Sequence, residues 1–155
     1  MADYDGFVAN WLDNLLNSIE ARAGKEVKAQ ILQDCARMCT AYWAQKAAEV
    51  REAAGDEEDV DALLAAFVAV LPGGDTELKR DGDTITWRFT GPVCPCPVEK
   101  YVDDPEFCHC SQTHVRGMLE PLLGRPVSVD LERTRHRGDP DCFFVVRLGS
   151  GEAEG

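Results

Sequence analysis

The sequence has no apolar run long enough to cross a bilayer and no surplus of positive charge. No stretch of about 18 consecutive apolar residues occurs, which argues against a transmembrane helix. With 16 Lys and Arg against 28 Asp and Glu, the formal net charge is −12. Nucleic acids and anionic membrane surfaces bind basic patches, so neither is expected as a partner.

The amino-terminal segment also lacks the features of a secretory signal. It begins MADYDGFVANWLDN, with early acidic residues and an amphipathic pattern. A signal peptide needs a basic start and a continuous apolar core, so we expect a cytoplasmic protein. In a reducing compartment, clustered thiols bind metal or perform redox chemistry more often than they form disulfides. The odd number of cysteines, 7, leaves at least one outside any intramolecular pairing.

Neither an internal repeat nor a long linker divides the chain. Its 155 residues and its 45% content of hydrophobic residues suit one globular domain. We expect this domain to span residues 1–148, with a helical part over 1–72 and a part containing the sheet and the cysteine-rich loop over 75–148. The polar tail, residues 149–155, is expected to be disordered.

The first half of the chain carries apolar residues at helical spacing. Three helices are expected: the first ends near Gly24, the second extends to about Val50, and the third ends at Pro72. The apolar positions assigned to them are Phe7, Trp11, Leu12, Leu15, Leu16 and Ile19; Val27, Ile31, Cys35, Met38 and Tyr42; and Val60, Leu63, Leu64, Phe67, Val68 and Leu71.

The second half changes to the period of β-strands. Residues 77–80 and 84–90 flank an Asp-Gly turn at 81–82, which predicts a β-hairpin. Apolar and polar residues alternate over 127–132 and again over 142–148. Two further half-buried strands are therefore expected.

One more helix is expected between the hairpin and these strands. Ser111 is a suitable N-cap for it and Gly124 a suitable end, while Pro121 inside it is expected to produce a kink. The predicted fold class is therefore α+β, with a helical amino-terminal half packed on a small antiparallel sheet and one further helix.

Four of the cysteines form two Cys-x-Cys pairs in one loop, Cys94 with Cys96 and Cys108 with Cys110. Zinc and iron–sulfur centres bind thiolates in a roughly tetrahedral arrangement. In an extended chain, residues two apart point to the same side, so both thiols of a pair can face one ion. We therefore predict a four-thiolate metal site, with zinc as the metal and an iron–sulfur cluster as the alternative.

Other residues could complete or replace this ligand set. Cys35 and Cys39 lie four apart and share a helix face, Cys142 begins a strand, and His109 offers an imidazole. Cys35 falls in an apolar stripe and Cys142 alternates with core positions, so buried packing is favoured for both. Cys39, at the edge of the stripe, is expected to be more open.

The same thiols also allow a catalytic interpretation. Cys110 precedes the predicted N-cap, where helix amides stabilise a thiolate, and His109 or His114 could serve as its base. Acidic neighbours oppose thiolate formation, whereas a bound metal would itself deprotonate the thiols. The metal interpretation therefore needs fewer conditions. A thiol redox protein is a third interpretation, which the absence of a Cys-x-x-Cys motif weakens.

One basic patch lies near the turn between the last two strands. It contains Arg133, Arg135, His136 and Arg137. Arg133 and Arg135 are candidates for binding the carboxylate or phosphate of a cofactor or ligand. The alternative is solvated charge that keeps a sheet edge soluble.

A family resemblance covers residues 108–148. The features that carry it are Cys108-His109-Cys110, the helix ending Leu122-Leu123-Gly124-Arg125-Pro126-Val127, the strand VSVDLERT, and the closing Gly138-Asp139-Pro140-Asp141-Cys142-Phe143. This part of the chain resembles the carboxy-terminal part of 4-vinyl reductase-type domains and is similar to L-2-amino-thiazoline-4-carboxylic acid hydrolase-like proteins. The resemblance implies an α+β domain, with helices on an antiparallel sheet, that binds a small molecule or a metal.

Together these features predict a cytosolic metal-binding domain with a sensing or small-molecule-binding role. The alternatives are a hydrolase of a small cyclic or amide-like substrate, acting through Cys110 or a metal-bound water, and a thiol redox protein. The expected partners are a small molecule or a metal ion, and a homo-oligomer is also considered. The sequence leaves undecided whether the chain is an enzyme.

Overall fold

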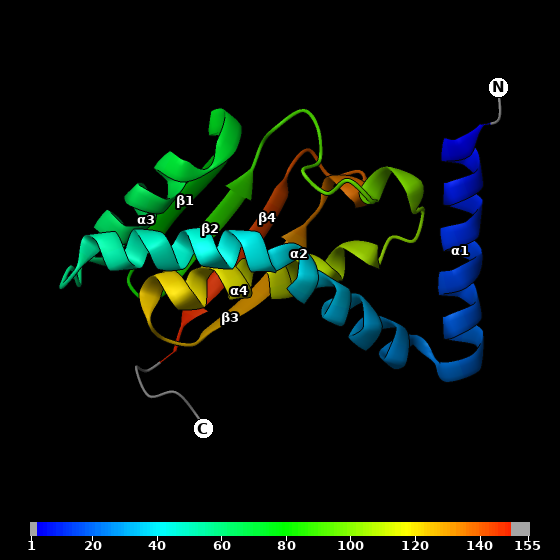
Figure 1. The fold of residues 1–155 in the computed structure, drawn as a ribbon, viewed down its shortest axis with the longest axis horizontal. Helices are drawn as coiled ribbons and strands as arrows, with labels where there is room; N and C mark the ends of the chain where they lie inside the picture. The colour runs from blue at the N-terminus through cyan, green and yellow to red at the C-terminus, as the bar shows by residue number, and fades with distance from the viewer. Residues whose placement is uncertain (1–2, 150–155) are drawn as a thin grey trace.

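The computed structural model describes residues 3–149, and the tail expected to be disordered lies outside them apart from Gly149. It confirms the predicted α+β class (Figure 1). The helices and strands are α1 (Tyr4–Ala23), α2 (Lys25–Ala54), α3 (Val60–Val70), β1 (Thr76–Asp81), β2 (Thr84–Phe89), α4 (Cys110–Leu123), β3 (Val127–Arg133) and β4 (Cys142–Leu148). Short 3₁₀ turns are η1 (Pro72–Gly74), η2 (Glu99–Tyr101), η3 (Phe107–His109) and η4 (Arg135–Arg137).

The four strands form one antiparallel sheet in the order β1-β2-β4-β3. The predicted hairpin is β1-β2, and its turn lies one residue later than expected. Asp81 pairs with Thr84, so the connecting residues are Gly82 and Asp83. Gly82 has a φ of +58°, a left-handed conformation that glycine adopts without a steric penalty.

Helices α2, α3 and α4 cover one face of the sheet, and the main core lies between the two layers (Figure 1). The fully buried side chains of this core include Phe67, Ile85, Leu119, Leu122 and Val146. Burying one such side chain contributes about 1.5–3 kcal/mol to folding. The other face of the sheet carries polar side chains such as the exposed Lys79 and Arg88.

Helices α2 and α4 approach each other closely at a glycine. A Cβ atom placed on Gly117 of α4 would lie 2.6 Å from Cγ2 of Thr40 on α2. Thr40 is buried and its hydroxyl donates a hydrogen bond to the Ala36 carbonyl at 2.7 Å, which fixes its rotamer. The absence of a side chain at Gly117 therefore sets the spacing of the two helices. α4 continues through Pro121 to Leu123 as one helix.

The buried face of α2 differs from the predicted one. Its buried residues are Lys28, Leu32, Ala36, Thr40 and Ala47. The apolar stripe expected to face the core is exposed instead, at Val27, Ile31, Cys35, Met38 and Tyr42. The two sets differ by about one position in the sequence. One position corresponds to a rotation of about 100° around the axis of an α-helix. The prediction of the helix was correct, and the prediction of its buried face was wrong.

Helix α1 stands at one end of the molecule, beside the loop that follows β2 (Figure 1). It packs on α2 and η2, with Leu12 and Leu16 in a second apolar cluster. The Tyr101 hydroxyl donates a hydrogen bond to the Asp5 carboxylate at 2.8 Å. The Asp3 carboxylate caps the start of α1 by accepting from the Gly6 amide at 3.0 Å. None of the helices in residues 3–149 combines the length and hydropathy of a membrane-spanning segment.

Candidate functional site

The two Cys-x-Cys pairs lie on the connection between β2 and α4. Cys94 and Cys96 are on its irregular part, Cys108 is in η3, and Cys110 is the first residue of α4. All four side chains are half-buried. The structure thus places the four predicted ligands on one segment that ends at a helix amino terminus.

This segment is held between α1 and α2 by an apolar cluster. Val102 and Phe107 from the segment are buried against Leu16 of α1 and Leu32 of α2. The partly buried side chains that pack on this cluster are Leu12, Cys96, Val98, Cys108 and Cys110. Three of the four predicted metal ligands therefore share one apolar environment.

Lys28 anchors the same segment electrostatically. Its side chain is 7% exposed, and its Nζ lies 2.5 Å from Oδ2 of Asp104 and also pairs with Glu20 of α1. Burial by itself would lower the pKa of Lys28, but the hydrogen bonds to Asp104 and Glu20 outweigh burial and raise the pKa. Lys28 thus joins α1, α2 and the thiol-bearing segment, and sequence analysis missed it. The only signal in the sequence was its i, i+4 spacing with Leu32.

His136 fastens the segment from the other side. Its Nδ1 lies 3.0 Å from Oε1 of Glu99, and its Nε2 lies 2.9 Å from the Asp104 carbonyl oxygen. The ring is 8% exposed and contacts Phe107 edge to face. His136 is therefore a buried anchor of this segment and not a member of an open basic patch.

The start of α4 differs from the prediction. The helix begins at Cys110, and Ser111 lies inside it, so the prediction of Ser111 as the N-cap was wrong. The Ser111 hydroxyl donates to the Cys108 carbonyl instead of accepting from a helix amide. The physical reason is that η3 leads directly into α4, with His109 already in a helical conformation, so no extended N-cap residue exists.

The thiols are less acidic than the nucleophile interpretation requires. Burial raises the pKa of Cys110 to about 12, with further repulsion from Cys96 and Cys108. Burial likewise raises the pKa of Cys94 to about 11, and it raises the pKa of Cys108. At neutral pH these three side chains are protonated thiols. The expected activation of Cys110 by the helix terminus is outweighed by burial, which disfavours a hydrolase that uses its thiolate.

Three of the predicted ligands, Cys96, Cys108 and Cys110, lie near one another because they pack on the same apolar cluster. Ionised Cys96 or Cys108 would oppose the ionisation of Cys110, and the same two side chains would oppose that of Cys94. Four cysteines suit zinc or an iron–sulfur cluster in their chemistry. Within residues 3–149, however, no three His, Cys, Asp or Glu side chains are arranged to hold one metal ion. The four-thiolate site stays a prediction.

The remaining cysteines have different surroundings. Cys35 is exposed, so the prediction that it is a buried packing residue was wrong, because the buried face of α2 is rotated away from it. Cys39 is exposed as expected and contributes to the raised pKa of Cys110. Cys142 packs on the main core as expected, with its Sγ 3.8 Å from Oγ1 of Thr134.

The two other histidines differ in their availability. His109 is 38% exposed, and its Nε2 lies 2.7 Å from Oε2 of Glu106. His114, one turn after Cys110 on the same side of α4, is half-buried. Burial lowers the pKa of His114, so its ring is neutral at pH 7.

The hydrogen bonds of Thr40 determine which ring nitrogen of His114 carries the proton. Oγ1 of Thr40 lies 2.9 Å from Nδ1 of His114 and donates its single proton to the Ala36 carbonyl. Nδ1 of His114 must therefore donate to Thr40. In a neutral ring this leaves Nε2 as a hydrogen-bond acceptor.

Arg133 is engaged by a residue that sequence analysis missed, Asp141. Nε of Arg133 lies 2.8 Å from Oδ1 of Asp141, and Nε of Arg88 lies 2.6 Å from Oδ2. The hydrogen bonds from Arg133 and then from Arg88 lower the pKa of Asp141 to about 2. The only signal in the sequence was the position of Asp141 immediately before the last strand.

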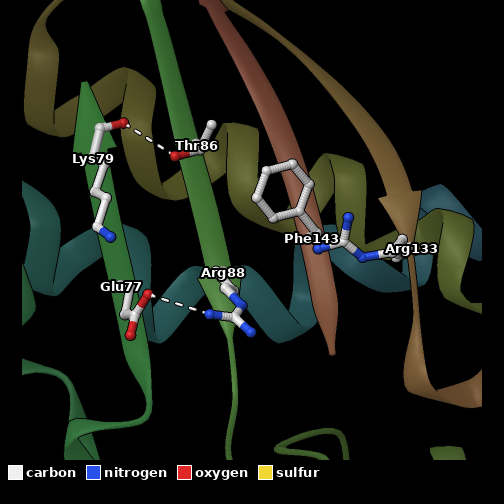
Figure 2. Close-up of a pocket in the computed structure, with 6 residues that line it drawn as sticks. All are labelled: Glu77, Lys79, Thr86, Arg88, Arg133 and Phe143. Carbon is white, nitrogen blue, oxygen red and sulfur yellow. Dashed lines mark hydrogen bonds and ion pairs between the residues drawn. The ribbon is translucent and has the colours of Figure 1, made fainter. Parts of the chain in front are cut away.

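Arg88 and Arg133 border a shallow pocket of about 270 Å³ on the open face of the sheet, with the helices behind it (Figure 2). The Arg133 guanidinium lies over the Phe143 ring, 4.5 Å from its centroid. An external anion would have to compete with Asp141 for Arg133. Arg135, the other candidate ligand-binding arginine, lies in η4 and does not line this pocket.

Comparisons with known proteins give a likeness of fold. No family model and no curated protein match the sequence. One similar solved structure is the phenol-responsive sensory domain of the transcription activator PoxR with phenol, at 13% identity and a TM-score of 0.53. The match covers 91% of this chain and 74% of that one.

A second similar structure is trafficking protein particle complex subunit 3 from Naegleria fowleri, covalently bound to palmitic acid. It is 16% identical with a TM-score of 0.51, and the match covers 92% of this chain and 95% of that one. At these identities the two likenesses establish the fold alone. The first is consistent with the resemblance to 4-vinyl reductase-type domains.

Proposed function

We propose that this chain is a sensing domain that binds a small, largely apolar organic molecule. The observation that carries the proposal is the match in fold, over 91% of the chain, to a sensory domain whose structure contains phenol. The second similar structure also holds an organic molecule, in that case palmitic acid. A shared fold does not determine function, so the proposal also needs a candidate contact on this chain.

His114 is the candidate contact. It projects from α4 towards Thr40 of α2, is half-buried and neutral, and has Nε2 as an acceptor because Nδ1 is committed to Thr40. A suitable ligand combines an apolar body with one hydroxyl group. Its apolar body would be buried, and its hydroxyl would donate a hydrogen bond to Nε2 of His114. Sites for small molecules commonly have this composition, mostly apolar with a few placed polar groups.

Titration calorimetry with phenol and benzene tests this proposal. Phenol should bind the full chain more tightly than benzene, which has no hydroxyl to donate. Replacing His114 by Phe removes the acceptor while keeping a ring, and should weaken phenol binding about 2- to 10-fold, the value of one hydrogen bond. His109→Gln is the matched control and should leave binding unchanged. Absence of phenol binding at millimolar concentration would refute the proposal, and an unaltered affinity in His114→Phe would refute the contact.

A cysteine-liganded metal is a second proposal for this chain, with zinc as the metal and an iron–sulfur cluster as the alternative. Its specific support is that Cys96, Cys108 and Cys110 pack on one apolar cluster, with Cys94 two residues before Cys96 in the sequence. Binding would require the segment to draw at least three thiols to one ion. A divalent cation would offset the repulsion among the thiolates and would release their protons.

Elemental analysis and absorption spectra of anaerobically purified protein test the metal proposal. Stoichiometric zinc without colour, or a brown iron-containing protein, is the expected result. Cys94→Ser and Cys108→Ser should each abolish stoichiometric metal, whereas Cys35→Ser, which changes an exposed cysteine, should retain it. A metal-free wild-type protein, or metal retained in both ligand variants, would overturn the proposal.

A further inference from the structure

Two consecutive helices expose large apolar side chains on their outer sides. These residues, called here the outer apolar surface, are Tyr4, Phe7, Val8, Trp11 and Leu15 on α1 and Val27, Ile31, Met38 and Tyr42 on α2. Tyr4 is 73% exposed, Phe7 66%, Trp11 56% and Met38 76%. Single exposed apolar residues are ordinary, but this many at helical spacing on two adjoining helices is not.

The outer apolar surface is distinct from the faces that hold the domain together. On α1 the inward residues are Leu12 and Leu16, which pack in the second apolar cluster. Trp11 lies about 140° around the helix from Leu16, at about 100° per residue. On α2 the inward residues include Leu32 and Ala36. Both helices are therefore apolar on two sides, and only one side of each is used within the chain.

The area of this surface matches what a stable protein interface needs. Aromatic side chains present about 150–250 Å² each when fully accessible, and the aliphatic ones present less. With the observed exposed fractions, the nine residues offer roughly 900 Å² of apolar area. A standard interface buries about 800 Å² on each partner.

The charge pattern favours a second copy of this chain as the partner. The protein has a net charge of −12, so most of its surface would repel an identical molecule. None of the nine residues of the outer apolar surface is charged; Asp34, on the same face of α2, is paired with Arg37, and Lys46, over the Tyr42 ring, is paired with Glu49. A two-fold contact places the same patch on both sides, so an uncharged patch is self-complementary. An anionic membrane would instead require positive charge here.

We propose that two copies of this chain associate through the outer apolar surface, with Trp11 as its main contact on α1. The interface forms with or without a bound small molecule, and so the inference is independent of the proposed function. It assigns a role to the stripe Val27, Ile31, Met38 and Tyr42, which the sequence suggested for the core and which α2 presents to the outside.

Sedimentation velocity of the full chain across a concentration series tests this inference. Wild-type protein should sediment as a dimer of about 34 kDa, twice the 17.1 kDa of one chain. Trp11→Glu should raise the dimer dissociation constant at least about 30-fold, as expected for a large aromatic interface residue. Asn17→Glu is the matched control, because it adds the same charge to an exposed site on α1 about 120° away from Trp11.

Circular dichroism confirms folding of each variant, and Met38→Glu replaces Trp11→Glu if the latter does not fold. A wild-type chain that stays monomeric at every concentration up to about 100 μM would overturn the proposal, since standard interfaces have dissociation constants below this value. So would a dimer that withstands Trp11→Glu. Binding of the monomer to neutral lipid vesicles would identify a lipid surface as the occupant and would also overturn it.

Discussion

Replacing Gly117 by Ala should destabilise the protein, although Gly117 lies in the interior of a helix. In an exposed helix the same change stabilises by up to about 1 kcal/mol, because glycine has the greater backbone entropy when unfolded. Here the new Cβ would lie 2.6 Å from Cγ2 of Thr40. Overpacking of this kind typically costs about 1–3 kcal/mol. We therefore expect a net loss of about 1 kcal/mol.

The clash involves one methyl group, so a second substitution that removes this group should make Gly117→Ala stabilising instead of destabilising. The next atoms of Thr40, Cβ and Oγ1, would lie 3.6 and 3.8 Å from the new Cβ, which is ordinary contact. Thr40→Ser removes only Cγ2 and keeps the hydroxyl that bonds to Ala36 and His114. In a Thr40→Ser background, Gly117→Ala should stabilise by up to about 1 kcal/mol. The coupling free energy between the two sites should therefore be about 2 kcal/mol.

Urea unfolding followed by circular dichroism measures all four members of this double-mutant cycle. In thermal unfolding, a change of 1 kcal/mol corresponds to about 2–4 °C in Tm for a chain of this size. Gly117→Ala alone should lower Tm by about 3 °C. Added to the Thr40→Ser variant, it should raise the Tm of that variant by a similar amount. An effect of Gly117→Ala that is the same in both backgrounds would show that contact with Thr40 does not set the helix spacing.

Two further predictions concern ion pairs. Lys28→Ala should lower the free energy of unfolding by about 2 kcal/mol at pH 7, less than for a fully buried pair because Asp104 is partly exposed; urea unfolding measures this, and an unchanged midpoint would contradict it. Because the folded pKa of Lys28 is raised above its ordinary 10.5, the contribution is present below pH 10.5 and lost as pH rises further. Asp141→Asn should destabilise the protein at pH 7, since Arg88 and Arg133 lose their counterion. The folded pKa of Asp141 is about 2, so its contribution is present above about pH 4 and declines as pH falls towards 2; unfolding of wild type and variant from pH 7 to 2 should converge.

Local patterns predicted the elements of this fold well, because the relevant interactions are local. Alternation of apolar and polar residues located β4 at Cys142–Leu148, and Pro72 located the end of α3 to within two residues. The buried face of α2 could not be obtained in this way. Its 30 residues carry two apolar stripes, and the choice between them depends on which one meets α4.

The properties of the candidate site depend still more on residues that are distant in the sequence, and so they were harder to predict. The two Cys-x-Cys pairs were visible in the sequence, but the raised pKa of Cys110 arises from burial against residues of α1 and α2. Lys28 reads as an ordinary surface lysine until Asp104 is placed beside it. Ser111 has the chemistry of an N-cap, and only the 3₁₀ turn before it removes that role.

The anchoring of the thiol-bearing segment also has a consequence for how the chain folds. The contact of Lys28 with Asp104 spans 76 residues, and that of Thr40 with His114 spans 74. Closing loops of this length is entropically costly, and contacts of high sequence separation slow folding. The surroundings of the cysteines are therefore completed only when α1 and α2 meet the segment that follows β2. During synthesis the thiols of this segment emerge after α2, and until the segment docks on α1 and α2 they are open to oxidants and to metal ions.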